Sequence, residues 1–136
     1  MKRVLTVWVL CVFLFSSVCG CSHAAAHYEG KQIAVEYWHT SCFDVGKSNF
    51  VYYEIAPKAS GTLPYDPKVY EVAFTVTKIK KEGIEITLSA EMDMQTGEDG
   101  YESVTSFTLR EGEAVRLVTP TVGGGGIFLF SVAEKE

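Results

Sequence analysis

Residues 69–91 read VYEVAFTVTKIKKEGIEITLSAE, and their side chains alternate between apolar and polar in two halves. Alternation with a period of two is typical of β-strands that bury one face and expose the other. Between the halves, residues 80–83 read KKEG, a charged turn with glycine where a positive φ is often needed. The apolar register shifts between Val76 and Ile79, which indicates a β-bulge. The pattern predicts a long β-hairpin at the centre of an antiparallel sheet.

Further segments along the chain have strand character, and glycine or proline separates them. They are residues 32–40, 49–56, 103–109, 114–119 and 127–132. We therefore predict an all-β fold, a single antiparallel β-sandwich of about seven strands, with a small β-barrel as the alternative. Short strands at this spacing also resemble immunoglobulin-like architecture. The Cys–Trp–Cys core of immunoglobulin domains is absent, so the resemblance extends to architecture alone.

Three stretches are predicted to be irregular. Residues 57–68 contain three prolines, which cannot donate to a central ladder. Residues 92–101, MDMQTGEDGY, form an expected acidic loop, and residues 120–126 form an expected loop with four consecutive glycines.

The N-terminus has the order of an export signal. Lys2 and Arg3 precede an uncharged apolar run over residues 4–18, and small residues follow. The run is shorter than the ~20 residues that span a bilayer. We predict an export signal over residues 1–20, a flexible tether over 21–31 and one domain over 32–136.

Two processing sites compete after this signal. Val18-Cys19-Gly20-Cys21 resembles the lipobox of bacterial lipoproteins. The resemblance implies that Cys21 carries a lipid, begins the mature chain and anchors it in the cell envelope. The alternative is cleavage after Ala26, in the run Ala24-Ala25-Ala26, which would release a soluble protein.

Charge and cysteine usage narrow the classes of partner. Removing Lys2 and Arg3 from the 12 basic residues leaves 10 against 17 acidic ones, so the net charge changes from −5 to −7. This balance argues against nucleic acid and against anionic lipid surfaces as ligands. Cys42 is the one cysteine left after the signal and Cys21, and we expect a packed thiol.

Catalytic and metal sites are weakly supported. His39 and Cys42 lie three positions apart, which puts them on opposite faces of a continuing strand, so we expect no catalytic pair. The histidine spacing predicts no zinc site, and no cofactor is expected. Asp93, Glu98 and Asp99 form a weak candidate loop for calcium, and a plain acidic turn is the favoured interpretation.

Aromatic residues, Phe50 among them, gather in residues 37–53. Tyr52 and Tyr53 face opposite sides of a strand, so at least one lies off the core face. Exposed rings of this kind anchor protein partners or stack on sugars. The candidate binding patch comprises Tyr37, Trp38, Phe43, Tyr52, Tyr53 and Tyr65.

The sequence predicts a non-enzymatic envelope protein that binds another protein or supports an assembly. One alternative is a carbohydrate-binding module that uses the exposed aromatics. The other is a small secreted hydrolase inhibitor that presents residues 57–68 or 123–126.

Overall fold

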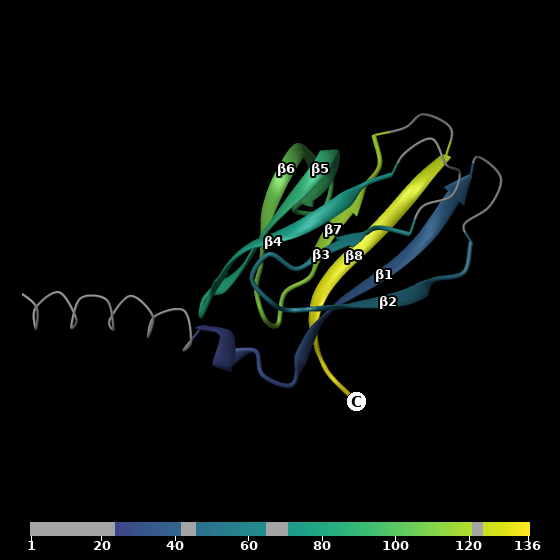
Figure 1. Cartoon of the computed structure of the whole chain (residues 1–136). Helices are drawn as coiled ribbons and strands as arrows, with labels where there is room; N and C mark the ends of the chain where they lie inside the picture. Colours follow the sequence, from purple (N-terminus) through teal and green to yellow (C-terminus); the bar gives the residue numbers. More distant parts are fainter. Residues whose placement is uncertain (1–23, 42–45, 65–70, 121–123) are drawn as a thin grey trace, which may run out of the picture.

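The computed structural model describes residues 24–41, 46–64, 71–120 and 124–136 (Figure 1). The described residues form strands separated by turns, with one helical turn at their start. The strands are β1 (Lys31–Ser41), β2 (Asn49–Glu54), β3 (Ser60–Thr62), β4 (Ala73–Lys80), β5 (Gly83–Thr96), β6 (Gly100–Leu109), β7 (Val115–Val118) and β8 (Gly124–Glu134).

All eight strands belong to one antiparallel sheet that nearly closes into a barrel (Figure 1). Neighbouring strands follow the order β2-β1-β8-β7-β5-β4-β3, and β6 pairs with β5 outside this path. The prediction of an all-β antiparallel sandwich or barrel is confirmed. The additional strand, β3, lies within residues 57–64, which were expected to be irregular. It is short and lies at the edge of the sheet, where its flanking prolines remove no ladder hydrogen bond.

Strand β5 connects the two walls of the barrel. Ile84 pairs with β4 on one side and with β6 on the other, whereas Met94 pairs with β7 and β6. Between these points β5 advances five residues, from Thr87 to Met92, while β6 advances two, from Ser106 to Val104. An irregularity of this kind bends the strand. As a result, β4 and β7 both lie on the same side of β5 and diverge from each other.

The central hairpin is confirmed as β4 and β5, and the bulge is confirmed between Val76 and Lys78. The reason for glycine at position 83 was wrong, because Gly83 does not have a positive φ. A Cβ there would lie 2.7 Å from Thr108 Cγ2 and 3.2 Å from the Leu109 carbonyl oxygen. Glycine at this position therefore permits close packing against β6.

Two predicted loops are strand ends. The expected acidic loop 92–101 shrinks to a turn at residues 97–99, where Gly97 has a φ of +70°. Met92 is fully buried and Met94 packs against the core. These inward side chains alternate with their acidic neighbours as in a β-strand, so β5 continues through this segment. The expected glycine loop is shorter as well, because residues 124–126 pair with the end of β1. Residues 121–123 lie outside the described part.

The core fills the space between the walls, and it contains buried side chains from almost every strand. Phe130 lies at its centre, with ring centroids 5.8 Å from Phe74 and 5.1 Å from Phe107 in edge-to-face contact. Each such burial contributes roughly 1.5–3 kcal/mol. The fully buried large side chains are Phe74, Phe128, Phe130, Ile33, Leu63, Ile84, Ile86, Met92, Leu109, Leu117, Val35 and Val72.

Side chains close the seam between the edge strands β2 and β3. The Tyr53 hydroxyl donates a hydrogen bond to the Thr62 carbonyl oxygen at 2.7 Å, and its ring packs on Phe74 at 4.7 Å. Burial, and secondarily Tyr37, raises the pKa of Tyr53 above its ordinary 10.0. Gly61 leaves room for the ring, because a Cβ there would lie 2.5 Å from Tyr53 Cε1.

Gly61→Ala is therefore expected to destabilise the fold. The methyl group must displace the Tyr53 ring or the β3 backbone, at a cost of about 1–3 kcal/mol in the free energy of unfolding. Chemical denaturation measures this change. Thr62→Ala is the matched control, since it lies on the same strand and keeps the carbonyl oxygen that Tyr53 binds. Equal stability of the Gly61→Ala variant and the natural protein would contradict the role of this seam.

Candidate functional site

The outer surface of β2, β1, β8 and β7 carries an aromatic patch. Phe50 and Tyr52 lie outward because their neighbours Val51 and Tyr53 pack against the core. Phe50 is 57% exposed and Tyr52 is 54% exposed. In the strand register, Phe50 on β2 pairs with Glu36 on β1. The same row continues through Leu129 on β8 to Arg116 on β7. We call this surface the aromatic face and define it by Trp38, Phe50, Tyr52, Arg116 and Leu129.

The rings of the aromatic face are held in a defined arrangement. Phe50 and Tyr52 are two residues apart on β2, and their rings are nearly parallel, at 12°, with centroids 6.4 Å apart. Arg116 places its guanidinium carbon 5.8 Å from the Trp38 ring centroid, which is within the range of a cation–π contact. The sheet therefore presents these groups on rigid backbone, which lowers the entropy lost on binding.

Parts of this face are buried, and one buried group lowers the stability of the fold. The Arg116 Nε is buried and has no hydrogen-bond partner among the described residues. An unsatisfied buried donor costs roughly 1–3 kcal/mol. Ala34 and Ile127 also lie on the outer side and outside the core cluster, yet they are only 4% and 9% exposed. Larger outer-face side chains therefore already cover these two residues and form a partly packed layer on this side of the sheet.

The opposite outer surface has a different chemistry. Ser60, Thr75, Thr87 and Ser106 lie in one row across β3, β4, β5 and β6, and we call this row the hydroxyl face. A shallow groove of about 390 Å³ lies there. Its charged group, Glu85, is already held by Lys80 at 2.8 Å, and this hydrogen bond lowers the pKa of the carboxyl group. Hydroxyl side chains are the usual occupants of solvated sheet surface, so this groove is not our candidate site.

The predicted binding patch is divided by the structure. Tyr52 and Trp38 lie on the aromatic face, whereas Tyr37 and Tyr53 pack against the core. Phe43 and Tyr65 lie outside the described residues. The sequence places Phe50 among the clustered aromatic residues, although the predicted patch omits it, and it gives no indication of Leu129 or Arg116. Alternation with Tyr52 could have placed Phe50, but nothing in the sequence indicates that β7 and β8 lie beside β1.

The candidate calcium loop is spread along a hairpin. Asp93 lies within β5, whereas Glu98 and Asp99 lie in the turn after Thr96. The turn is closed by the Gln95 amide, which donates to the Gly97 and Glu98 carbonyl oxygens at 3.1 and 3.2 Å. Among the described residues, no group of three His, Cys, Asp or Glu side chains could hold a metal ion.

The histidine of the rejected catalytic pair lies at the end of β1. His39 is exposed, and its carbonyl oxygen accepts a hydrogen bond from the Gly46 amide at 2.9 Å. Cys42 lies outside the described residues, so its expected burial stays a prediction.

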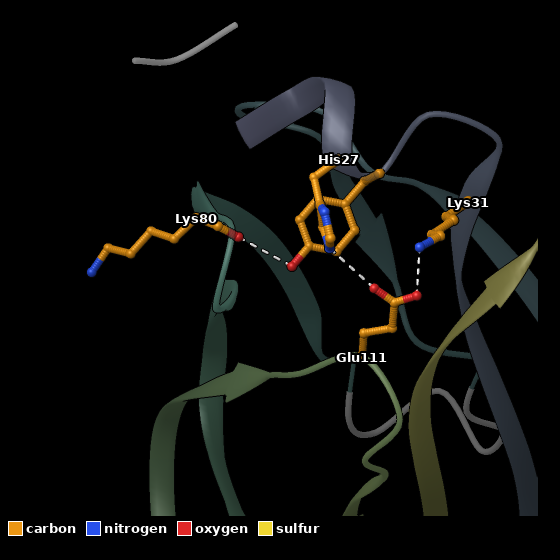
Figure 2. A network of polar contacts seen from close by, with 5 residues as sticks. His27, Lys31, Lys80 and Glu111 are labelled. Carbon is orange, nitrogen blue, oxygen red and sulfur yellow. Dashed lines mark hydrogen bonds and ion pairs between the residues drawn. The ribbon is translucent and has the colours of Figure 1, made fainter. Parts of the chain in front are cut away.

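The segment before β1 packs against one end of the barrel. Residues 24–27 form a helical turn, and Tyr28 is only 3% exposed and belongs to the core cluster. Its hydroxyl donates to the Lys80 carbonyl oxygen at 3.1 Å (Figure 2). The expected flexible tether over 21–31 is therefore wrong from residue 24 onward. The polar residues around Tyr28 in the sequence gave no indication that its side chain is buried. Residues 21–23 lie outside the described part.

An ion-pair network holds this segment to the turn between β6 and β7 (Figure 2). Glu111 accepts a hydrogen bond from Lys31, and His27 Nε2 lies 3.1 Å from its other oxygen. The bond from Lys31 is the main cause that lowers the pKa of Glu111 below its ordinary 4.5, and the same bond raises the pKa of Lys31 above 10.5. Burial, and then Glu111, raises the pKa of Tyr28.

We expect Glu111→Gln to lower the thermal midpoint at neutral pH and to have little effect in acid. A carboxylate whose pKa is lowered by folding stabilises the fold fully above pH 4.5, and this contribution disappears as the pH falls through the lowered pKa. Lys31 has the opposite sign, so its contribution disappears as the pH rises past 10.5. Thermal unfolding of both proteins across this range measures the difference. Glu102→Gln, an exposed carboxylate on β6, is the control. A difference that grows as the pH falls would contradict the network.

Comparison of the chain with protein-family models, with curated proteins and with solved structures finds no match. The described residues contain no helix that is both long and apolar enough to cross a membrane.

Proposed function

We propose that this protein is an exported, non-enzymatic docking domain of the cell envelope that binds another polypeptide through its aromatic face. The observation that carries the proposal is the Phe50–Tyr52 pair, which is more than half exposed on the same outer surface as the Trp38–Arg116 pair. Aromatic residues and arginine are the side chains that most often dominate protein–protein binding energy.

The surroundings of the aromatic face favour a polypeptide over other ligands. Glu36 lies between Phe50 and Leu129 in the register, and a carboxylate at that position is unfavourable for insertion into lipid. The Trp38 ring is covered by Arg116, which leaves less of it for a stacked sugar. A protein partner can use the exposed rings, the cation and the carboxylate together.

A lipid on Cys21 would set the distance of the domain from the membrane. Ala24, where the packed segment begins, follows Cys21 by three positions, so the chain between them spans at most ~11 Å. The proposed anchor would therefore hold the barrel close to the bilayer, and its partner would be met at the membrane surface.

Intact-mass measurement of the exported protein tests the anchor. We expect a chain that begins at Cys21 and carries added acyl mass, because the lipobox-like motif ends there. Cys21→Ser in the full-length protein is the control and should abolish the added mass. A bare chain that begins at His27 would contradict the anchor and support the soluble alternative.

Site-specific photo-crosslinking tests the docking surface. We replace Tyr52 with p-benzoylphenylalanine in the full-length protein and illuminate the producing cells. Discrete protein adducts are expected, because this position would lie within the interface. The same replacement at Thr87, on the hydroxyl face, is the matched control and should give none. Equal adducts at both positions, or none at Tyr52, would contradict the proposal. Adducts made of sugar would favour the carbohydrate-binding alternative.

A further inference from the structure

We propose that the polypeptide bound at the aromatic face is a second copy of this chain, packed face to face about a two-fold axis. This inference rests on the proposed function, because it names the partner at the same surface. It follows from the distribution of charge across the face, from its size and from the position of the N-terminal segment.

The aromatic face has charges of opposite sign on its two halves. One row across the sheet reads Arg116 on β7, Leu129 on β8, Glu36 on β1 and Phe50 on β2. Arg116 lies at one end of this row. Glu36 lies two strands away from it, on the other side of Leu129. A surface with this polarity is complementary to itself once its direction is reversed.

A two-fold axis that runs along the strands, in the plane of the interface, reverses the row. Arg116 of one copy then comes over Phe50 of the second copy and next to its Glu36, and the reciprocal contacts form by symmetry. Sheets that pack face to face lie ~10 Å apart, which long side chains such as arginine can bridge. The exposed rings of both copies are buried in the same step.

The face has the area of a small specific interface. β1 and β8 each contain 11 residues, whereas β2 contains 6 and β7 contains 4, together 32. At ~3.3 Å per residue and ~4.8 Å between strands, these strands present roughly 500 Å² of outer surface per copy. Two copies would therefore bury roughly 1,000 Å² in total, which is the lower limit for a specific interface.

The N-terminal segment fits the same axis. Tyr28 contacts the end of β4 at Lys80, and Lys31 binds Glu111 at the end of β6, so the segment packs at one end of the strands (Figures 1 and 2). A two-fold axis that runs along the strands places the N-terminal segments of both copies at the same end of the dimer. Both copies could then be anchored in one membrane.

Charge exchange between two tagged copies tests the dimer. Full-length proteins with different C-terminal tags are co-produced and extracted in mild detergent, and recovery of one tag through the other is measured. We expect the natural chains to co-purify. Arg116→Glu or Glu36→Arg, made in both copies, should each reduce recovery roughly tenfold or more, because like charges then face each other. The double variant, with both changes, should restore recovery. Lys78→Glu, a reversal outside the aromatic face, is the matched control and should have no effect.

Each result decides the inference. Recovery that is absent in the natural chains, or unchanged in the single variants, or not restored in the double variant, would overturn the two-fold dimer. Circular dichroism checks that each variant is folded. Arg116→Glu removes the Trp38–Arg116 contact, whereas Glu36→Arg leaves this contact in place. Glu36→Arg therefore still tests the interface if Arg116→Glu disturbs the fold. Adducts at position 52 with a different protein, without co-purification of the two copies, would overturn this inference and leave the proposed docking function standing. The absence of both would overturn both.

Discussion

The bend in β5 between Thr87 and Met92 is the constraint on which the rest of the fold depends. Because one strand pairs with β4 before the bend and with β7 after it, a single sheet provides both walls of the core. The walls enclose Phe74, Phe107 and Phe130, and the Phe130 ring contacts each of the other two rings edge to face. The bend also gives the molecule two outer surfaces that face different directions, so each can have its own chemistry.

The local pattern of the sequence predicts the strands well and their spatial neighbours poorly. Alternation is a local signal, so the 69–91 hairpin and its bulge could be located from it. Sheet order is set by contacts between residues far apart in the chain, such as β1 with β8, and no local signal reports them. Acidic neighbours made the segment with Met92 and Met94 look like a loop rather than a strand. Polar residues around Tyr28 made its segment look like a flexible tether. Gly83 was assigned to a turn, although its function is close packing against β6.

The same limit explains why the candidate site was only partly predicted. Tyr52 and Trp38 could be named from the aromatic-rich segment, but Tyr37 and Tyr53 on the same strands pack against the core. Arg116 joins the site only because β7 pairs with β8, which pairs with β1. The contrast between the two outer surfaces is also visible only after folding. One is a row of hydroxyl groups, whereas the other holds bulky rings and a guanidinium, and only the second offers much binding energy to a partner.

The packed N-terminal segment relates the proposed anchor to the proposed interface. A flexible tether over residues 21–31 would let the barrel turn freely and would place no condition on the geometry of a dimer. Tyr28 removes that freedom, because its buried ring and its bond to the Lys80 carbonyl oxygen fix the direction in which the chain leaves the barrel. Two anchored copies can then meet at their aromatic faces only if their strands run alongside each other with the same ends toward the membrane. This arrangement is the one that sets Arg116 of one copy beside Glu36 of the other, so the anchor and the charges of the aromatic face favour the same geometry.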